Sequence, residues 1–359
     1  MNLVLCEENK MRVLHVLSCD KFSGAENVAC QIIEGMNEKS VESYYASPDG
    51  AIRNVLKDKK VNFIPLKKSN ISEVYKAIKQ VEPDIIHAHD MKASFNVSLA
   101  CGKVPFVSHI HNNNYNSQSV SIKSLLYLFA AKRSKHIFWV SKSSLEGYRF
   151  HNLVKDKSTV LYNVINIEEL KNKVKEDSHE YEYDCSFVGR ITYQKNPERL
   201  LNVMEKIVSS KPNVKIVVIG NGDLYEKIKV ESIQKGLAEN IDFLGFLYNP
   251  YKILYQCKVM LMTSRWEGTP MCALEAMSLG VPIVSTPTDG LCDLIENGYT
   301  GYLSDDDDEL ARCCLKIIED KNLHNILSAN SQKSMIDAMN MEQYINDILN
   351  KYREIFKGL

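Results

Sequence analysis

The order of apolar runs and polar stretches predicts alternating strands and helices along the whole chain. Short apolar runs typical of buried strands are separated by longer amphipathic segments such as 25–36, 71–81 and 92–101. This alternation favours parallel sheets covered by helices. The expected strands are 11–17, 43–46, 62–65, 84–87, 106–109 and 137–140 in the first half, then 184–188, 215–219, 241–243, 259–262 and 282–284.

The strand pattern stops once and then restarts, which predicts two α/β domains. The interruption, 169–183, is polar and charged and has few residues suited to a core. A chain of 359 residues is also long for a single core. We therefore expect a first doubly wound domain over 1–178, a linker near 177–183, and a second doubly wound domain over 184–340.

Composition changes this picture little. Apolar residues make up 45% and charged residues 25% of the chain, and the net charge is −1, so nothing favours nucleic acid as a partner. The ten cysteines lack the spacing of a zinc site. They are scattered along the chain, as is typical of free thiols in a reducing cytoplasm. Residues 1–10 make a poor signal peptide because acidic residues, Glu7 and Glu8, follow the short apolar start. No apolar run in the sequence is long enough to span a membrane. We expect a cytoplasmic protein.

The most informative segment is 264–277, which follows the expected strand 259–262. Its two carboxylates, Glu267 and Glu275, are eight positions apart, with Gly268 and Pro270 between them. Glu267 then lies at the carboxyl end of a strand and Glu275 in the first turns of a helix, where open α/β sheets bind ligands. The helix N-terminus offers unpaired N–H groups to a diphosphate, and carboxylates accept hydrogen bonds from sugar hydroxyls. For two glutamates alone, a surface loop followed by an amphipathic helix is an equal alternative.

A second segment, 187–197, combines a short strand, a glycine turn and a helix that begins at Pro197. Arg190 and Lys195 lie in the turn, after Gly189. Arginine offers a planar fork to phosphate oxygens and lysine a compact point charge. Two loop cations are usually only solvated, but followed by the glutamate pair they predict a nucleotide-sugar site.

With both segments in this order, the chain resembles the retaining GT-B glycosyltransferases of the large bacterial polysaccharide and lipopolysaccharide family, glycosyl transferases group 1. The resemblance is strongest over 185–303. It implies a GT-B architecture, two Rossmann-like doubly wound domains facing a deep interdomain cleft. The first would bind the acceptor and the second the nucleotide-sugar donor, and the last helix, 341–357, would pack back on the first.

The resemblance also implies the reaction. A sugar would move from a nucleoside-diphosphate sugar, with a UDP-sugar favoured, to the hydroxyl of an acceptor such as a lipid-linked glycan in capsule, exopolysaccharide or lipopolysaccharide synthesis. Configuration would be retained, and neither a metal nor another cofactor is expected. Arg190 and Lys195 would stabilise the departing diphosphate, Glu267 would hold the sugar hydroxyls, and Glu275 would hold the ribose.

Further donor contacts follow from the same resemblance. In the first domain, Gly24 lies in the turn after the first strand, where the family usually has two glycines and this chain has one. His111, with His109 as the reserve, ends a strand where the family has a histidine that contacts the donor sugar. The other expected donor contacts are Gly189, Asn221, Gly222, Leu247, Gly268, Thr269, Pro270, Met271 and Cys272.

Two other classes of site are disfavoured. The chain has no complete G-x-G-x-x-G fingerprint, which argues against a dinucleotide dehydrogenase. The acidic run 305–308 looks like a metal motif, but acids at a helix N-terminus explain it better because they complement the helix dipole.

The segment 121–135 has two interpretations that the sequence leaves open. Its leucines and phenylalanine are followed by Lys132, Arg133 and Lys135, and a basic amphipathic helix of this kind can lie on an anionic membrane. An ordinary core-packing helix with a positive last turn fits equally well.

Two further functions stay as alternatives to the transferase. One is a sugar-nucleotide epimerase on the same fold, and the other is a non-catalytic subunit that binds nucleotide sugars. The sequence does not identify the nucleobase or sugar of the donor, or the acceptor. It also leaves the oligomeric state open.

Overall fold

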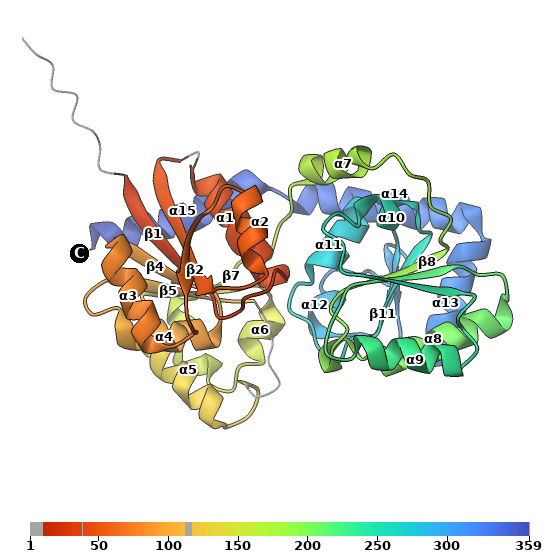
Figure 1. Ribbon diagram of the computed structural model, residues 1–359, viewed down its shortest axis with the longest axis horizontal. Coiled ribbons are helices and arrows are strands. Elements are labelled where there is room, and N and C mark those ends of the chain that lie inside the picture. Colours follow the sequence, from red (N-terminus) through yellow and green to blue (C-terminus); the bar gives the residue numbers. More distant parts are fainter. Residues whose placement is uncertain (1–9, 38, 112–116, 359) are drawn as a thin grey trace, which may run out of the picture. The chain divides into compact units, whose positions relative to one another are not determined.

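The computed structural model describes residues 10–37, 39–111 and 117–358, and it divides into two compact units (Figure 1). The first unit ends at Asn163 and takes in the chain from Glu342 onward, and the second runs from Val164 to Met341. Each unit is built on one sheet in which all paired strands are parallel. The expected doubly wound α/β fold class is therefore confirmed.

The first unit has a seven-stranded sheet in the order β3-β2-β1-β4-β5-β6-β7. β1 and β4 are neighbours, so the strand order reverses between them, and this switch point is where such sheets bind ligands. The strands are β1 (Met11–Val16), β2 (Val41–Pro48), β3 (Asn62–Leu66), β4 (Ile85–Ala88), β5 (Phe106–Ile110), β6 (His136–Trp139) and β7 (Ser158–Val160).

Helices cover both faces of this sheet. Figure 1 shows α3, α4 and α5 together on one side, where α3 packs on α4 and α4 on α5, and α1 with α15 on the other. A side chain on Gly35 of α1 would collide with Ile345 of α15, so these two helices lie in close contact. The helices are α1 (Gly24–Asn37), α2 (Ile52–Asp58), α3 (Ile71–Val81), α4 (Met91–Ala100), α5 (Ile122–Arg133), α6 (Lys142–Glu146) and α15 (Met341–Lys357), with short 3-10 turns at His151–Leu153 and Lys155–Lys157.

Local sequence explains where several of these helices begin. Asn70 caps α3 by accepting a hydrogen bond from the Glu73 N–H at 2.9 Å, and Asp90 caps α4 by accepting one from Ala93 at 2.6 Å. Such caps satisfy N–H groups that the helix itself leaves unpaired. Both helices therefore begin directly after the strand-to-helix turn that the sequence predicts.

The second unit has a six-stranded sheet in the order β10-β9-β8-β11-β12-β13. Its strands are β8 (Cys185–Val188), β9 (Ile216–Ile219), β10 (Ile241–Gly245), β11 (Val259–Met262), β12 (Ile283–Ser285) and β13 (Gly301–Leu303). Its helices are α7 (Ile167–Glu176), the 3-10 turn η4 (Tyr193–Lys195), α8 (Pro197–Ser210), α9 (Tyr225–Gln234), α10 (Tyr251–Gln256), α11 (Met271–Ser278), α12 (Asp289–Cys292), α13 (Asp307–Glu319) and α14 (Lys321–Ala338).

Two helical layers enclose this second sheet. α8 packs on α9 and α13 on one face, and α11 packs on α7, α10 and α14 on the other. The strands β9 and β11 are buried along their whole length, as parallel strands covered on both faces must be. The apolar core of the unit lies mainly under α8 and α13.

The division between the units differs from the expected one. We expected the first domain to end at 178 and the second to span 184–340, with a linker near 177–183, but the units divide after Asn163. The helix α7 packs on α10 and α11 and so belongs to the second unit. The charged stretch after it is also held there, because Tyr181 and Tyr183 pack against the apolar cluster under α10.

All eleven expected strands are present, with ends shifted by one or two residues. The two strands that the sequence reasoning missed, β7 and β13, have three residues each. β12 is equally short but was predicted because Val281 and Pro282 extend its apolar run, whereas β7 begins with two polar residues and β13 with a glycine. The two missed strands form because the preceding strand already offers an edge to pair with.

Candidate active site

The loops that follow β8, β9 and β10 are pinned to one another at the carboxyl edge of the second sheet. The Gly189 N–H donates to the Ile219 carbonyl at 3.0 Å, and the Gly220 N–H donates to the Gly245 carbonyl at 2.7 Å. A Cβ atom on Gly220 would lie 1.9 Å from the Gly189 carbonyl oxygen, and the φ of +137° at Gly220 also favours glycine. The sequence analysis missed Gly220, although it directly follows a predicted strand.

Asn221 and Gly222, both expected donor contacts, extend the same arrangement. The Asn221 side chain accepts a hydrogen bond from the Gly222 N–H at 2.7 Å, and the Asn221 carbonyl accepts one from the Ile191 N–H at 3.0 Å. A Cβ atom on Gly222 would lie 2.2 Å from the Ile191 carbonyl oxygen. The absence of a side chain at Gly222 therefore lets the loop after β9 approach the loop after β8.

The chemical centre of this edge is a buried ion pair between Lys195 and Glu267. The Lys195 Nζ lies 2.5 Å from Glu267 Oε1, and the two residues are only 7% and 4% exposed. The Ser264 hydroxyl donates to the same Oε1 at 2.5 Å. The two sequence segments are thus brought together through a lysine on η4, after β8, and a glutamate on the loop after β11.

The electrostatics of Lys195 differ from those of an ordinary loop cation. Burial by itself lowers the pKa of Lys195, but the charge and hydrogen bond of Glu267 outweigh it and hold the pKa above its usual value. Lys195 is therefore charged at neutral pH. A solvated loop cation, the usual case for such residues, describes Arg190, which is exposed, but not Lys195, which is buried.

Gln194 connects the exposed cation to the buried pair. Its side-chain oxygen accepts a hydrogen bond from Arg190 Nη2 at 3.4 Å, and its side-chain nitrogen donates to the Trp266 carbonyl at 3.0 Å and to Glu267 Oε2 at 3.5 Å. Gln194 thus orients groups from both segments. It was part of the recognised segment but was assigned no role, because an amide side chain carries no charge signal in a sequence.

The segment from Gly268 to Cys272 forms the entry to α11. Pro270 precedes the helix, and the first helical amides, those of Met271 and Cys272, have no partner within the helix. Burial raises the pKa of the Cys272 thiol to about 11, so the thiol is neutral. Gly268, Thr269, Pro270 and Met271 are all buried, so the loop lies against the body of the unit.

A close backbone approach fixes this entry from the other side. A Cβ atom on Gly290 of α12 would lie 1.2 Å from the Gly268 carbonyl oxygen. Only glycine fits at this contact, which brings the loop after β12 against the loop that carries Glu267.

Glu275 lies on α11, one helical turn beyond this entry. The Tyr251 hydroxyl of α10 donates to Glu275 Oε1 at 3.2 Å, and Lys173 of α7 is a nearby cation. Burial raises the pKa of Glu275 to about 7, although Tyr251 and Lys173 act in the opposite direction. Glu275 therefore changes charge near neutral pH. Leu247, after β10, packs on the apolar cluster under α10.

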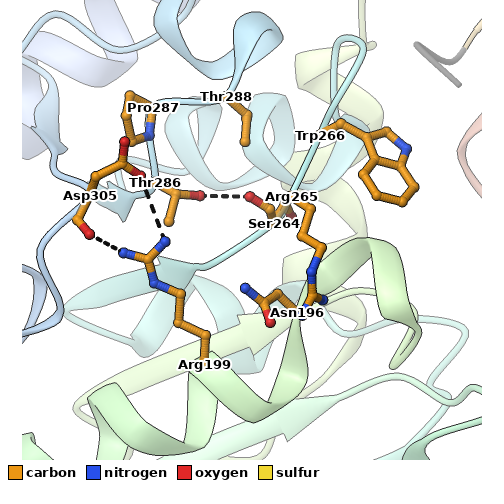
Figure 2. A pocket seen from close by; sticks show the side chains of 9 residues that line it. All are labelled: Asn196, Arg199, Ser264, Arg265, Trp266, Thr286, Pro287, Thr288 and Asp305. Carbon is orange, nitrogen blue, oxygen red and sulfur yellow. Dashed lines mark hydrogen bonds and ion pairs between the residues drawn. The ribbon is translucent and has the colours of Figure 1, made fainter. Parts of the chain in front are cut away.

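A polar cavity of about 330 Å³ lies beside the Glu267 loop (Figure 2). Thr286 donates to the Ser264 carbonyl at 2.8 Å, and Arg199 is held by Asp305 and by Asp307, the latter at 2.6 Å. Sequence reasoning missed this cavity because its walls come from four separate loops. The lining residues are Asn196, Arg199, Ser264, Arg265, Trp266, Thr286, Pro287, Thr288 and Asp305.

The acidic run 305–308 has structural partners. Asp306 caps α13 by accepting a hydrogen bond from the Glu309 N–H at 2.8 Å, Asp307 pairs with Arg199, and Asp308 pairs with Lys206 at 2.5 Å. Helix capping and ion pairing account for these acids, in line with the interpretation favoured from the sequence.

Gly24 and His111, the remaining expected site residues, belong to the first unit. Gly24 is the first residue of α1, and the carbonyl of the preceding Ser23 accepts the Asn27 N–H at 2.9 Å. His111 directly follows β5, and its Nε2 lies 3.0 Å from His89 Nδ1. Burial lowers the pKa of His111 to about 3, so its ring is neutral. The expected role of these two residues in donor contact stays a prediction.

Two family models match the chain, and the boundary between them lies close to the division between the two units. A family model described as Glycosyltransferase Family 4 matches residues 22–169, and one described as Glycosyl transferases group 1 matches residues 168–334. The second match contains Arg190, Lys195, Glu267 and Glu275.

Individual proteins extend the match over nearly the whole chain. The chain is 26% identical to the UDP-Gal:alpha-D-GlcNAc-diphosphoundecaprenol alpha-1,3-galactosyltransferase of Escherichia coli, over 96% of this chain and 97% of that protein. Among solved structures, Alr3699/HepE of Anabaena in complex with UDP and glucose superposes with a TM-score of 0.83 at 18% identity, covering 95% of this chain and 99% of the other. Sucrose-phosphate synthase from Thermosynechococcus elongatus gives 0.80 at 14% identity, covering 97% and 100%. The chain therefore belongs to the group 1 glycosyltransferases and has their GT-B fold.

Proposed function

We propose that this glycosyltransferase moves a sugar from a UDP-sugar to the hydroxyl of a lipid-linked glycan in bacterial polysaccharide synthesis, with retention of configuration and without a metal at the diphosphate. The observation that carries the proposal is the buried constellation of Lys195, Glu267 and Ser264 beside the first amides of α11. Charged groups are buried in this way only when they are paired, and such pairs recur at functional sites.

Breaking the anomeric bond of a nucleoside-diphosphate sugar leaves negative charge on the β-phosphate. Arg190 is exposed and keeps most of its guanidinium N–H groups available, because its hydrogen bond within the described part of the chain is a long contact of 3.4 Å to Gln194. The amides of Met271 and Cys272 add donors that point out of α11. Together with the Lys195 ammonium, they would stabilise the leaving diphosphate, which is the part that a metal ion has in other transferases.

The geometry leaves one oxygen of Glu267 for a substrate. Its Oε1 is held by Lys195 and Ser264, each at 2.5 Å, whereas Oε2 has, among the described residues, only the Gln194 amide at 3.5 Å. A carboxylate oxygen with spare lone pairs accepts hydrogen bonds from sugar hydroxyls. We therefore assign the donor sugar to Oε2. We assign the ribose diol to Glu275. A carboxylate accepts stronger hydrogen bonds from hydroxyl groups than a neutral side chain in its place would.

Support for the donor base and the acceptor comes from the relative in Escherichia coli. Its name specifies UDP-Gal as the donor and a sugar linked to diphosphoundecaprenol as the acceptor. The identity of the donor sugar cannot be carried over from a relative that is 26% identical, because small differences in pocket contacts decide which sugar is bound. The class of donor and the class of acceptor are what we take from it.

The helix α5 supports a lipid-linked acceptor. The side of α5 that packs on the unit carries Ser124, Tyr127, Ala130 and Ala131. The remaining apolar side chains point to solvent, with Ile122 78%, Leu125 48%, Leu126 41% and Phe129 44% exposed, whereas Leu128 packs against the apolar cluster that contains Tyr127. The helix therefore packs on the core through one face, as one interpretation of 121–135 expects, and has an apolar outer face as well.

Basic residues accompany the exposed apolar ones. Lys123, Lys132, Arg133 and Lys135 are exposed on α5 or directly after it. Apolar side chains that enter the interface and cations that pair with lipid phosphates are what an anionic membrane surface attracts. We assign the outer face of α5 to peripheral membrane contact. Among the described residues, no helix has both the length and the apolar character of a membrane span.

Donor binding is the first test. Thermal melting would be followed with UDP, GDP, ADP and their sugar conjugates, with no added metal. A ligand that binds only the folded state raises the melting temperature, so we expect a shift with UDP and UDP-sugars that Arg190→Ala reduces. A shift with another base would correct the donor, and no shift with any nucleotide would favour a non-catalytic subunit.

Transfer is the second test. The donor is incubated with a lipid-diphosphate-linked sugar, and the configuration of the new bond is determined by NMR. We expect a product of retained configuration, no donor turnover without acceptor, and no rate increase on adding Mg²⁺ or Mn²⁺. Donor conversion without acceptor would show an epimerase instead. Activity that depends on either ion would overturn the metal-free proposal.

A further inference from the structure

Five buried or half-buried histidines gather on three neighbouring strands of the first unit. They are His15 on β1, His87 and His89 at the end of β4, and His109 and His111 at the end of β5. β1, β4 and β5 are the central strands of the sheet, at its switch point. Four of the five rings are fully buried, and His111 is half-buried. Of the five, only His111 is an expected donor contact, with His109 as its reserve.

The spacing along the strands explains why the rings meet. Residues two apart on a strand point to the same face, so His87 and His89 stack with ring centroids 4.0 Å apart. His15 pairs in register with His87 on the adjacent strand, and its ring centroid lies 5.2 Å from those of both His87 and His89. Two strands thus bring three imidazoles to one place.

The cluster leaves polar atoms unpaired in the interior. His15 Nε2, His87 Nε2 and both ring nitrogens of His109 are buried and have no hydrogen-bond partner in the described part of the chain. Buried polar atoms in native proteins are nearly always paired, and exceptions call for a water or an ion. Imidazole is also the commonest protein ligand of metal ions and suits zinc, copper and nickel.

We propose that His15, His87 and His89 bind a divalent transition-metal ion of the zinc class, which ties β1 to β4. One ring nitrogen of each of the three lies within 4.8 Å of the others. Two nitrogens on a tetrahedral zinc ion are about 3.3 Å apart, given Zn–N distances of about 2.0–2.1 Å. His15 Nδ1 and His89 Nε2 form a hydrogen bond at 2.9 Å, so they are already near that spacing, and the ion would take the place of their shared proton.

The chemistry of the cluster suits such an ion. All three rings are fully buried, and metal ligation uses the neutral form of imidazole, which is also the form that burial favours. The His87 Nδ1 lies 2.5 Å from the Tyr352 hydroxyl of α15, a second partner that fixes the ring and leaves Nε2 for the ion. Ligands that are all imidazole select zinc, nickel or copper over magnesium or manganese.

A second group of three, His89, His109 and His111, meets the same distance criterion. We favour the first group because its three rings are fully buried and none has another role. In the second group, His111 is the predicted donor contact. The choice between the groups is part of the test.

The experiment measures ion content in the whole chain, purified without a histidine tag from cells grown with added Zn²⁺ or Co²⁺. Elemental analysis is expected to give about one ion per chain. The cobalt form is expected to show the intense visible absorption of a tetrahedral site. Neither readout requires enzyme activity or a variant, so both are independent of the proposed transfer reaction.

Variants assign the ligands. His15→Gln and His89→Gln are expected to lower the ion content at least about tenfold, the equivalent of 1.4 kcal/mol or more. His136→Gln and His111→Gln are expected to keep it. His136 is the matched control, because it is a buried histidine of the same sheet whose Nε2 is satisfied by Thr159 Oγ1 at 2.9 Å. Circular dichroism checks that each variant is folded.

Two results would overturn the proposal. Less than about a tenth of an ion per chain in the parent protein from both media, with no cobalt absorption, would mean that water and hydrogen bonds between imidazoles fill the cluster. Loss of the ion in His111→Gln together with its retention in His15→Gln would move it to the second group and refute the ligands assigned above.

Discussion

Two clusters of buried polar side chains, one in each unit, lie at equivalent places in their sheets but differ in how they are satisfied. In the second unit, Lys195 and Glu267 lie after β8 and β11, the pair of strands at the switch point, and almost every polar atom of the pair has a partner. In the first unit, the histidines lie at β1, β4 and β5, and several ring nitrogens have none.

The difference follows from charge. Burying an unpaired charge is so unfavourable that Lys195 and Glu267 must be buried together or not at all. A histidine can shed its proton instead, and the lowered pKa values in the cluster show that burial has this effect. A neutral ring tolerates an unpaired nitrogen at a smaller cost. This difference agrees with the two proposals above, in which the ion pair serves a charged substrate and the histidine cluster supplies neutral ligands.

The strongest test of this comparison is Glu267→Ala. It leaves the Lys195 ammonium buried without a partner, and breaking a buried pair costs about 3–5 kcal/mol of unfolding free energy. We also expect transfer to fall by about a hundredfold or more, since the group holds substrate and orients Lys195. Denaturant unfolding and steady-state transfer measure the two effects.

The double variant Lys195→Met with Glu267→Leu separates them. Replacing a whole buried pair by apolar residues is often neutral for stability, so we expect most of the unfolding free energy to return while transfer stays low. A double variant that transfers at the parent rate would show that the pair is purely structural.

Arg190→Ala is expected to have a large effect on rate and a small one on stability. The exposed guanidinium contributes little to folding, so the unfolding free energy should change by less than about 0.5 kcal/mol. Transfer should fall by about a hundredfold. The control is Arg312→Ala, whose guanidinium on α13 is also exposed and pairs with Glu309. Equal rates in both variants would contradict the role of Arg190.

A smaller effect is expected from pH. Because the pKa of Glu275 is about 7, its carboxylate is protonated as pH falls below that value. Charge-assisted hydrogen bonds to the ribose are then lost, and UDP affinity should fall roughly fivefold between about pH 8 and about pH 6. Calorimetric titration at several pH values measures it, and Glu275→Gln should remove the dependence.

The pH dependence of folding stability due to Glu275 has the opposite sign to that of UDP affinity. A carboxyl whose folded pKa is raised above its unfolded value stabilises the fold fully below the unfolded value, and this contribution is lost as pH rises through about 7. In ligand-free protein, Glu275→Gln should therefore reduce the loss of stability between pH values of about 5 and about 8. An unchanged pH profile in this variant would mean that Glu275 is already ionised.

The smallest expected effect is that of His109→Leu. Both ring nitrogens of His109 lack partners among the residues that the structure describes, so their removal should change the unfolding free energy by less than about 1 kcal/mol. His87→Leu should cost more, because it leaves the Tyr352 hydroxyl buried without its partner. Thermal unfolding of the two variants measures the difference. A larger loss in His109→Leu than in His87→Leu would show that an ion or water holds His109.

The sequence predicted the elements better than their assignment to units. Apolar runs such as 259–262 are long enough to identify a buried strand, and all eleven expected strands are present. The division at 177–183 was misplaced because charge and polarity suggested a linker, whereas Tyr181 and Tyr183 within that stretch pack on the second unit. Pattern alone does not show which core an isolated aromatic residue joins.

What the sequence determined by itself is the α/β alternation, the family, and the candidate residues Arg190, Lys195, Glu267 and Glu275, because strand periodicity and charged residues at fixed spacing are local features. Only the tertiary structure decided that Lys195 and Glu267 are buried and paired, that Leu125 and Leu126 of α5 face solvent, and that histidines from three strands share one place. These depend on contacts between residues far apart in the chain, and burial, on which pKa and pairing depend, exists only once those contacts have formed.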